Sequence, residues 1–273
     1  MSDPVVVCDL DGVVWRGELA VGGSADAIAT LRAAGIHVAF LTNNSSNPVG
    51  HVVERLAACG VAAEPADVLT SAQAAASLLA EGLPAGARVL ACAGAGVREA
   101  LAAAGYVVVE DGAAEAVVVG WHREFDFERL DRAAQAVRGG ARFVATNTDP
   151  TYPDARRVLP GAGAIVAAVA TAAGRAPEVA GKPHRATAEL VRARVGATGV
   201  LVGDRPSTDG AMAAVLGWPF GLVLSGIGGH DPAEPIPDPA PRFVGADLRA
   251  LAPALVEHAR AAAAGPGTSS APR

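Results

Sequence analysis

The stretch VVVCDLDGVVWRG, residues 5–17, decides the fold, because an apolar run ends there in two acidic residues. The run of valines and Cys8 is typical of a buried parallel strand. Asp9 and Asp11 follow one residue apart, and residues i and i+2 of a strand point to the same side. Two carboxylates that converge on one spot repel each other unless a positive charge lies between them. The sequence therefore predicts a strand end that needs a cation.

Working outward, short β-branched runs alternate with alanine-rich helical stretches along most of the chain. This alternation is typical of a parallel sheet covered by helices, so we predict an α/β fold. The predicted strands are 4–9, 36–42, 88–92, 106–109, 116–120, 142–146, 199–203 and 220–225. The predicted helices are 24–34, 49–58, 71–80, 96–104, 126–138, 162–173, 185–195 and 208–215. So many strands favour two α/β units over one small sheet.

The composition excludes several classes of protein. The chain has 273 residues, of which 51% are hydrophobic and 18% charged, so it can build a core. Its formal net charge of −6 argues against nucleic acid or an anionic membrane as partner. Cysteines are odd in number and lack metal-binding spacing, which predicts buried reduced thiols at Cys8, Cys59 and Cys92.

Two segments bear on localisation. The start, MSDPVVV, lacks the charged-then-apolar pattern of a signal peptide. The uncharged stretch 210–229 is long enough to span a bilayer, but glycines and Pro219 interrupt it. We therefore predict a short helix and a buried strand there, and we expect a cytoplasmic, soluble protein with no membrane partner.

Four polar stretches carry the candidate chemistry: DLDG at 9–12, FLTNNSS at 40–46, AGKPH at 180–184 and LVGDRPSTDG at 201–210. Three of them come directly at the end of an apolar strand. Ligands of open α/β sheets bind beyond the carboxyl ends of the strands. The sequence therefore predicts that these stretches meet at one edge of one sheet.

The residue types in these stretches are complementary. Mg²⁺ prefers hard oxygen ligands, and four carboxylates are available: Asp9, Asp11, Asp204 and Asp209. Phosphate oxygens are held by hydrogen-bond donors and positive charge, which are supplied by Thr42, Asn43 and Lys182. An aspartate nucleophile, a second carboxylic acid, a metal and a lysine make a phosphoryl-transfer site. An aspartyl-phosphate would divide one hard hydrolysis into two easier displacements.

In their order and spacing, DLDG, LTNNSS, GKP and GDRPSTD resemble the four motifs of the haloacid dehalogenase superfamily of phosphatases. The TNN and GDR-x-x-TD forms resemble its subclass of 4-nitrophenylphosphatase-like, phosphoglycolate and glycerol-phosphate phosphatases. Stretches similar to the cap of that subclass occur at 117–130, 143–153 and 159–163. The resemblance covers residues 4–250. One departure is Gly210-Ala211, where the family has an apolar β-branched residue after TD; this affects packing rather than chemistry.

The resemblance implies a Mg²⁺-dependent phosphomonoesterase with a division of roles. Asp9 would be the nucleophile and a metal ligand. Asp11 would be the general acid and then the general base, with its backbone carbonyl on the metal. The phosphoryl group would be held by Thr42, Asn43 and Lys182. Asp204 would complete the metal site, with Asp209 a ligand or a neighbour of the ligands.

The resemblance also implies the domain organisation. A Rossmann-like parallel-sheet core is predicted at 1–75 and 179–260, with an inserted α/β cap at 76–178. The proline-rich run at 230–242 is predicted to be an extended surface connection, and the tail 261–273 to be disordered. Homodimers formed through the cap are a further expectation from the resemblance.

Caps of this size exclude water and bulky esters, so small phosphorylated metabolites are the expected substrates. Glycerol 3-phosphate is favoured on overall resemblance, and phosphoglycolate stays open. Nucleoside monophosphates, pyridoxal phosphate and sugar phosphates are alternatives. The cap residues predicted to contact substrate are Asn147, Asp149 and Arg156.

Two interpretations compete with a phosphatase. The stretch VLACAGAGVREALAAAGYVVVE, 89–110, has the outline of a dinucleotide-binding unit, with Gly94, Gly96 and the acidic Glu110. However, Glu99 stands where the third glycine belongs, and a βαβ unit of the cap explains the pattern without a cofactor. The other alternative is an inactive α/β scaffold that binds a partner. Clustered aspartates argue against it, because they cost stability unless they are used.

Overall fold

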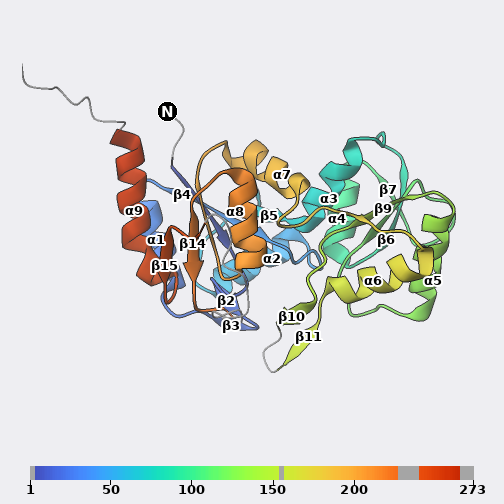
Figure 1. Cartoon of the computed structure of the whole chain (residues 1–273), viewed down its shortest axis with the longest axis horizontal. Helices are drawn as coiled ribbons and strands as arrows, with labels where there is room; N and C mark the ends of the chain where they lie inside the picture. The colour runs from blue at the N-terminus through green and yellow to red at the C-terminus, as the bar shows by residue number, and fades with distance from the viewer. Residues whose placement is uncertain (1–3, 154–156, 227–239, 265–273) are drawn as a thin grey trace, which may run out of the picture.

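The computed structural model describes residues 4–153, 157–226 and 240–264, and most of its strands form two parallel sheets. The two sheets lie in separate lobes along the long axis of the molecule (Figure 1). The predicted α/β fold is confirmed by this architecture.

The first sheet has six parallel strands in the order β15-β14-β13-β1-β4-β5. Their bounds are β1 (Val5–Asp9), β4 (His37–Thr42), β5 (Val68–Thr70), β13 (Val200–Gly203), β14 (Phe220–Val223) and β15 (Phe243–Gly245). In the register of the central strand β1, Asp9 lies opposite Leu41 and Cys8 opposite Val202. The polar residues that end these strands therefore meet at one edge of the sheet.

Helices cover both faces of this sheet. They are α1 (Ser24–Ala33), α2 (Val49–Ala58), α7 (Arg185–Val195), α8 (Ala211–Leu216) and α9 (Leu248–Ala264). Val6 and Cys8 of β1 belong to the core cluster that contains residues of α1, α2 and α9. Val5 and Val7 belong to the cluster that contains α7 and α8. The valine run of β1 is apolar at every position because both of its faces are buried.

The second sheet has five parallel strands in the order β12-β9-β8-β6-β7. Their bounds are β6 (Arg88–Cys92), β7 (Val107–Val109), β8 (Ala116–Val119), β9 (Arg142–Ala145) and β12 (Glu178–Val179). One face packs on α3 (Ser71–Ala80) and α4 (Ala95–Ala103), and the other on α5 (Phe127–Arg138) and α6 (Ala162–Ala173).

Two antiparallel hairpins complete the described strands. The first pairs β2 (Trp15–Arg16) with β3 (Leu19–Ala20), directly after the first aspartate motif. The second pairs β10 (Thr151–Pro153) with β11 (Val158–Pro160), and it extends from the second lobe beneath the junction of the two lobes (Figure 1).

Every predicted strand and helix forms within a few residues of its expected bounds. Helix α9, which carries Pro253 in its interior, and several strands of two or three residues were not predicted. Because α9 continues to Ala264, the predicted disorder is wrong for 261–264, while the rest of the tail lies outside the described residues. Most of the proline-rich run 230–242 also lies outside them.

The predicted boundary between core and cap at position 75 falls inside α3, whose apolar residues pack on the second sheet. The division into core and cap at that residue stays a prediction.

None of the described helices is both long and apolar enough to cross a membrane. The described part of the uncharged stretch 210–229 contains α8 and β14, which confirms the predicted short helix and buried strand.

Candidate active site

Three carboxylates meet at the carboxyl edge of the first sheet. Asp9 ends β1, Asp204 follows β13, and Asp209 lies in the single π-helical turn Pro206–Gly210. One carboxylate oxygen from each residue lies within 4.8 Å of the others, and all three residues are buried. The sequence motifs that were predicted to meet at one sheet edge are therefore brought together.

Two glycines of these motifs make this approach possible. A Cβ on Gly12, whose φ is +86°, would lie 2.4 Å from Oδ2 of Asp204. A Cβ on Gly203 would lie 2.2 Å from Cγ of Asp209. Any side chain at either position would displace a carboxylate, because real Cβ atoms do not approach other atoms so closely.

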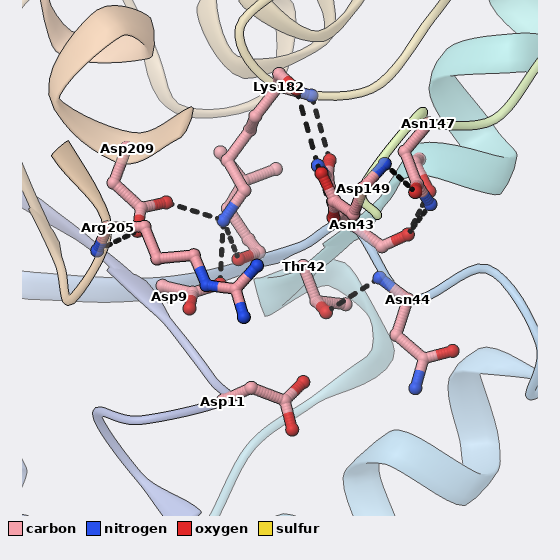
Figure 2. A network of polar contacts seen from close by, with 12 residues as sticks. Asp9, Asp11, Thr42, Asn43, Asn44, Asn147, Asp149, Lys182, Arg205 and Asp209 are labelled. Carbon is pink, nitrogen blue, oxygen red and sulfur yellow. Dashed lines mark hydrogen bonds and ion pairs between the residues drawn. The ribbon is translucent and has the colours of Figure 1, made fainter. Parts of the chain in front are cut away.

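Lys182 provides the positive charge within this cluster. Its Nζ lies 2.7 Å from Oδ1 of Asp9 and 2.7 Å from Oδ1 of Asp209, and its side chain is 3% exposed (Figure 2). Burial lowers the pKa of Lys182, but the carboxylates of Asp209 and Asp9 raise it by more. Lys182 is therefore protonated at neutral pH. Burial raises the pKa of Asp9, and Lys182 opposes that effect.

A magnesium ion fits this donor set. Three buried carboxylates face one buried ammonium, so the cluster lacks positive charge. Burial, followed by the neighbouring Asp209, raises the pKa of Asp204 to about 7. Asp9, Asp204 and Asp209 would hold the ion, since carboxylate oxygens are its preferred ligands. When bound, it keeps the carboxylates ionised and neutralises charge on a phosphate group.

Asp11 lies beside this cluster but its carboxylate is engaged elsewhere. Its Oδ1 accepts a hydrogen bond of 3.0 Å from Nε1 of Trp15. The guanidinium of Arg55 lies 4.1 Å from the centroid of the Trp15 ring. Burial raises the pKa of Asp11, while Arg55 and the bond from Trp15 lower it, and the net shift is upward. A carboxyl group with a raised pKa is suited to proton transfer near neutral pH.

The TNN motif follows β4. Oγ1 of Thr42 accepts from the backbone N–H of Asn44 at 3.0 Å, which leaves its hydroxyl hydrogen available to a ligand. The side chain of Asn43 points to protein groups instead, namely the backbone of Lys182 and the carboxylate of Asp149 (Figure 2). The predicted phosphate contact of Asn43 would therefore come from its backbone N–H.

The predicted cap residues lie after β9. Asn147 is buried and its Nδ2 donates to the backbone carbonyl of Asn43 at 2.7 Å. Asp149 lines the cavity in front of Asp9, and burial raises its pKa, which the bond from Asn43 lowers in part. Arg156 lies outside the described residues.

The cavity in front of Asp9 has a volume of about 70 Å³. The second lobe and the β10–β11 hairpin contribute seven residues to the lining of the cavity: Trp121, Asn147, Asp149, Thr151, Tyr152, Gly161 and Ala162. The two aromatic rings have centroids 4.8 Å apart, and the Tyr152 hydroxyl accepts from Nδ2 of Asn44 at 3.2 Å. Trp121 and Tyr152 were not predicted as site residues, although the chain has only three Trp and two Tyr and both residues occur in the cap-like stretches.

The glycines of the dinucleotide-like stretch have a packing role. A Cβ on Gly94 would lie 2.5 Å from the carbonyl oxygen of Ser46, and one on Gly96 would lie 2.2 Å from that of Asn47. The N–H of Gly96 donates to Ser46 at 3.0 Å. Because the loop after β4 occupies the start of α4, no room is left there for a pyrophosphate. Glu110 forms an ion pair with Arg98.

Comparison with known proteins agrees with this site. The family model of haloacid dehalogenase-like hydrolases matches residues 6–107, and a HAD-hydrolase-like model matches residues 179–251. The D-glycerol 3-phosphate phosphatase of Mycobacterium tuberculosis is 39% identical over 251 residues, which are 90% of this chain and 70% of that protein. This chain belongs to the haloacid dehalogenase-like hydrolases.

Other haloacid dehalogenase-like relatives are phosphatases as well. An acid sugar phosphatase of Staphylococcus saprophyticus is 38% identical over 64% of this chain and 68% of that protein. The crystal structure of a glycerol phosphate phosphatase of M. tuberculosis in complex with magnesium superposes with a TM-score of 0.84 at 38% identity, covering 93% of this chain and 78% of that one. A p-nitrophenyl phosphatase of Archaeoglobus fulgidus superposes with a TM-score of 0.83 at 27% identity, covering 93% and 100%.

These findings confirm the predicted family, the α/β fold, the class of enzyme and the cofactor. The chain is a haloacid dehalogenase-like phosphatase, and the relatives named here act on small phosphorylated compounds, one of them solved in complex with magnesium.

Proposed function

We propose that this haloacid dehalogenase-like phosphatase hydrolyses glycerol 3-phosphate, with Asp9 as nucleophile and Asp11 as proton donor and acceptor. The observation that carries the proposal is the buried cluster of Asp9, Lys182 and two further carboxylates, with Asp11 beside it, in a cavity of about 70 Å³. The preference for glycerol 3-phosphate rests on the 39% identical relative, which is named for that substrate.

In the first step, a carboxylate oxygen of Asp9 attacks phosphorus and forms an acyl-phosphate bond. The bond between phosphorus and the ester oxygen breaks, and Asp11 gives its proton to that oxygen, so the product leaves as a neutral alcohol. Lys182 and the hydroxyl of Thr42 hold the phosphoryl oxygens during this step. The ammonium of Lys182 is suited to this, because it already lies 2.7 Å from the attacking carboxylate.

In the second step, ionised Asp11 removes a proton from a water molecule, and the resulting nucleophile attacks the phosphorus of the aspartyl-phosphate. The bond between phosphorus and the Asp9 oxygen breaks, which releases inorganic phosphate and restores the carboxylate of Asp9. The proton that Asp11 gives to the alcohol in the first step is replaced in the second step by one from water, so the site returns to its starting state after each turnover.

The experiment is a phosphate-release assay of the full-length protein with Mg²⁺ over a panel of esters. The panel contains glycerol 3-phosphate, phosphoglycolate, sugar phosphates, a nucleoside monophosphate, pyridoxal phosphate and 4-nitrophenyl phosphate. We expect the highest kcat/KM among metabolites for glycerol 3-phosphate, and no turnover by Asp9→Asn prepared in parallel. A higher kcat/KM for another metabolite would overturn the substrate, and turnover by Asp9→Asn would overturn the site.

Two further properties belong to the proposal. We infer a cytoplasmic protein, supported by the free thiols of Cys8, Cys59 and Cys92, which are typical of a reducing compartment. We also infer a homodimer through the cap, supported by the partly exposed Val107 on the edge strand β7. Cell fractionation tests the location, and recovery in a membrane or secreted fraction would contradict it. Size exclusion with light scattering tests the oligomeric state, and a monomer would contradict the homodimer.

A further inference from the structure

The side-chain amide of Asn43 binds both backbone polar groups of Lys182 (Figure 2). Its Oδ1 accepts from the N–H of Lys182 at 2.8 Å, and its Nδ2 donates to the carbonyl of Lys182 at 3.3 Å. These two bonds fix the backbone from which the Lys182 side chain extends to Asp9 and Asp209. The Asn43 amide therefore anchors the backbone end of the Lys182 side chain, whose ammonium also bonds to Asp9 and Asp209.

Asp149 determines which way this amide faces. Nδ2 of Asn43 also donates to the carboxylate of Asp149, at 3.1 Å to Oδ2 and 3.3 Å to Oδ1. An ionised carboxylate only accepts hydrogen bonds, so it attracts the NH₂ end of the amide and repels the carbonyl end. A flipped amide would present NH₂ to the N–H of Lys182, and both backbone bonds would be lost.

Asp149 is itself held by the loop that precedes α6. Its backbone N–H donates to Oδ1 of Asn147 at 3.0 Å, and its carbonyl accepts from the N–H of Gly163 at 2.9 Å. A Cβ on Gly161 would lie 2.2 Å from that carbonyl oxygen, so the loop and the start of α6 are in close contact. The carboxylate of Asp149 is therefore placed by elements that pack on the second sheet, whereas Asn43 follows β4 of the first.

We propose that Asp149 is a positioning residue that couples the seating of the 147–151 loop to the alignment of Lys182, through the amide of Asn43. The proposal rests on the proposed function, and it gives Asp149 a different task from the substrate contact predicted from the sequence. With the loop seated, the amide is oriented and the ammonium of Lys182 is held against Asp9. With the loop displaced, Asn43 loses its anionic partner and the backbone of Lys182 is free to shift.

The test compares Asp149→Ala, Asp149→Leu and Asp149→Asn in the full-length enzyme with Mg²⁺, on 4-nitrophenyl phosphate and on glycerol 3-phosphate. Loss of a hydrogen bond to a charged group predicts a fall in kcat of about 10- to 100-fold for Ala and Leu. The fall should be equal for the two substrates, with KM unchanged, because Lys182 acts on the phosphoryl group common to both. Asp149→Asn should recover most of the lost kcat, since its Oδ1 can still accept from Asn43.

A double variant tests the route of the effect. If Asp149 acts through Asn43, adding Asp149→Leu to Asn43→Ala should cause no further loss, whereas independent effects would multiply. Asp131→Ala, which removes an exposed carboxylate of α5, is the matched control and should behave as wild type. Denaturant unfolding of each variant identifies any that fails to fold; Leu keeps the volume of the site if Ala does not.

Three outcomes would overturn the proposal. A loss confined to glycerol 3-phosphate, or one expressed in KM, would make Asp149 a substrate contact. Multiplicative losses in the double variant would remove Asn43 from the route. If Asp149→Asn is as slow as Asp149→Leu, the side-chain oxygen that accepts the hydrogen bond from Asn43 does not account for the effect on kcat. Inactivity of the wild-type enzyme on every ester would instead contradict the proposed function, so the two failures are distinguishable.

Discussion

The ammonium nitrogen of Lys182 lies 2.7 Å from Oδ1 of Asp9, although the two residues are 173 positions apart in the chain. The contact joins the end of β1 to the loop before α7 and buries both charges. In a site that binds a phosphate ester, this ammonium favours the ionised form of Asp9, which burial disfavours, and it offsets the repulsion between the attacking carboxylate and the phosphate.

Lys182→Met should abolish turnover and destabilise the metal-free protein. Removing one partner of a buried ion pair leaves uncompensated charge, which costs about 3–5 kcal/mol of unfolding free energy. Here two carboxylates, Asp9 and Asp209, would lose their cation. Urea unfolding at pH 7 in a chelator measures the change. Lys182→Arg, which keeps the charge, is the matched variant and should lose less stability; equal stability of Met and wild type would contradict the prediction.

Stabilisation by Mg²⁺ should grow as the pH rises through about 7. Asp204 has a folded-state pKa raised to about 7, above the ordinary value of 3.8, so without metal its ionisation opposes folding. Protonation of Asp204 therefore increases the free energy of unfolding of the metal-free protein as the pH falls from above 7 toward 4. Mg²⁺ binds the ionised form of Asp204, so its stabilising effect has the opposite pH dependence. Thermal unfolding with Mg²⁺ or with chelator at pH 5.5 and 8 measures both trends.

Chelation should also abolish phosphate release, and added Mg²⁺ should restore it. Ca²⁺ should bind without supporting turnover, because its larger and looser coordination shell misplaces Asp9. Full turnover in excess chelator, or a Mg²⁺-induced rise in Tm that is larger at pH 5.5 than at pH 8, would contradict the assignment of the cluster as a metal site.

Removal of the cap tests the predicted division of the chain. Because α3 packs on the second sheet, a deletion of 71–178 should leave a better-folded core than the originally predicted 76–178, which retains half of that helix. The shorter core keeps Asp9 and Lys182, so it should hydrolyse 4-nitrophenyl phosphate while losing discrimination among metabolites. Circular dichroism and ester assays compare the two deletions. An unfolded core from both would mean that the two sheets are one folding unit.

The sequence predicted the strand-end residues well because their positions follow from a simple rule: parallel strands end at one edge. The positions of Asp9 and Asp204 could be predicted from that rule alone. The bond between Asn43 and Asp149 could not be predicted, because it joins two loops 106 residues apart whose conformations no periodicity sets. Tyr152 was missed for the same reason. Helix α9 was missed because Pro253 in its interior breaks the pattern expected of a helix.

Trp15→Phe should weaken Asp11 as a proton donor and leave the residues that hold the phosphoryl group unchanged. In the wild-type protein, the 3.0 Å hydrogen bond from Nε1 of Trp15 lowers the pKa of Asp11, and the variant removes this bond. The pKa of Asp11 should therefore rise further, and the basic limb of the pH–rate profile should move to higher pH. Loss of one hydrogen bond predicts a fall in kcat of about 2- to 10-fold for glycerol 3-phosphate. A basic limb that stays in place or moves down would contradict this arrangement.

Substitution of Asp9 and substitution of Asp11 should impair different steps of the reaction. Asp9→Asn removes the attacking carboxylate, so turnover should fall to background for every ester. Asp11→Asn keeps the nucleophile but loses the proton that an alkoxide leaving group needs, so glycerol 3-phosphate should slow by about 10²- to 10⁴-fold. The first step with 4-nitrophenyl phosphate should be much less affected, because its phenolate departs without a proton.

The second step separates the two aspartates most clearly. Because Asp11 also activates water, its loss should trap the aspartyl-phosphate, and Asp11→Asn should release 4-nitrophenolate as a burst of one equivalent per site. Rapid-quench kinetics, with acid-precipitated protein analysed for bound phosphate, measures both the burst and the intermediate. A burst from Asp9→Asn, or an equal first-step loss for the two leaving groups in Asp11→Asn, would mean that the roles of these carboxylates are assigned wrongly.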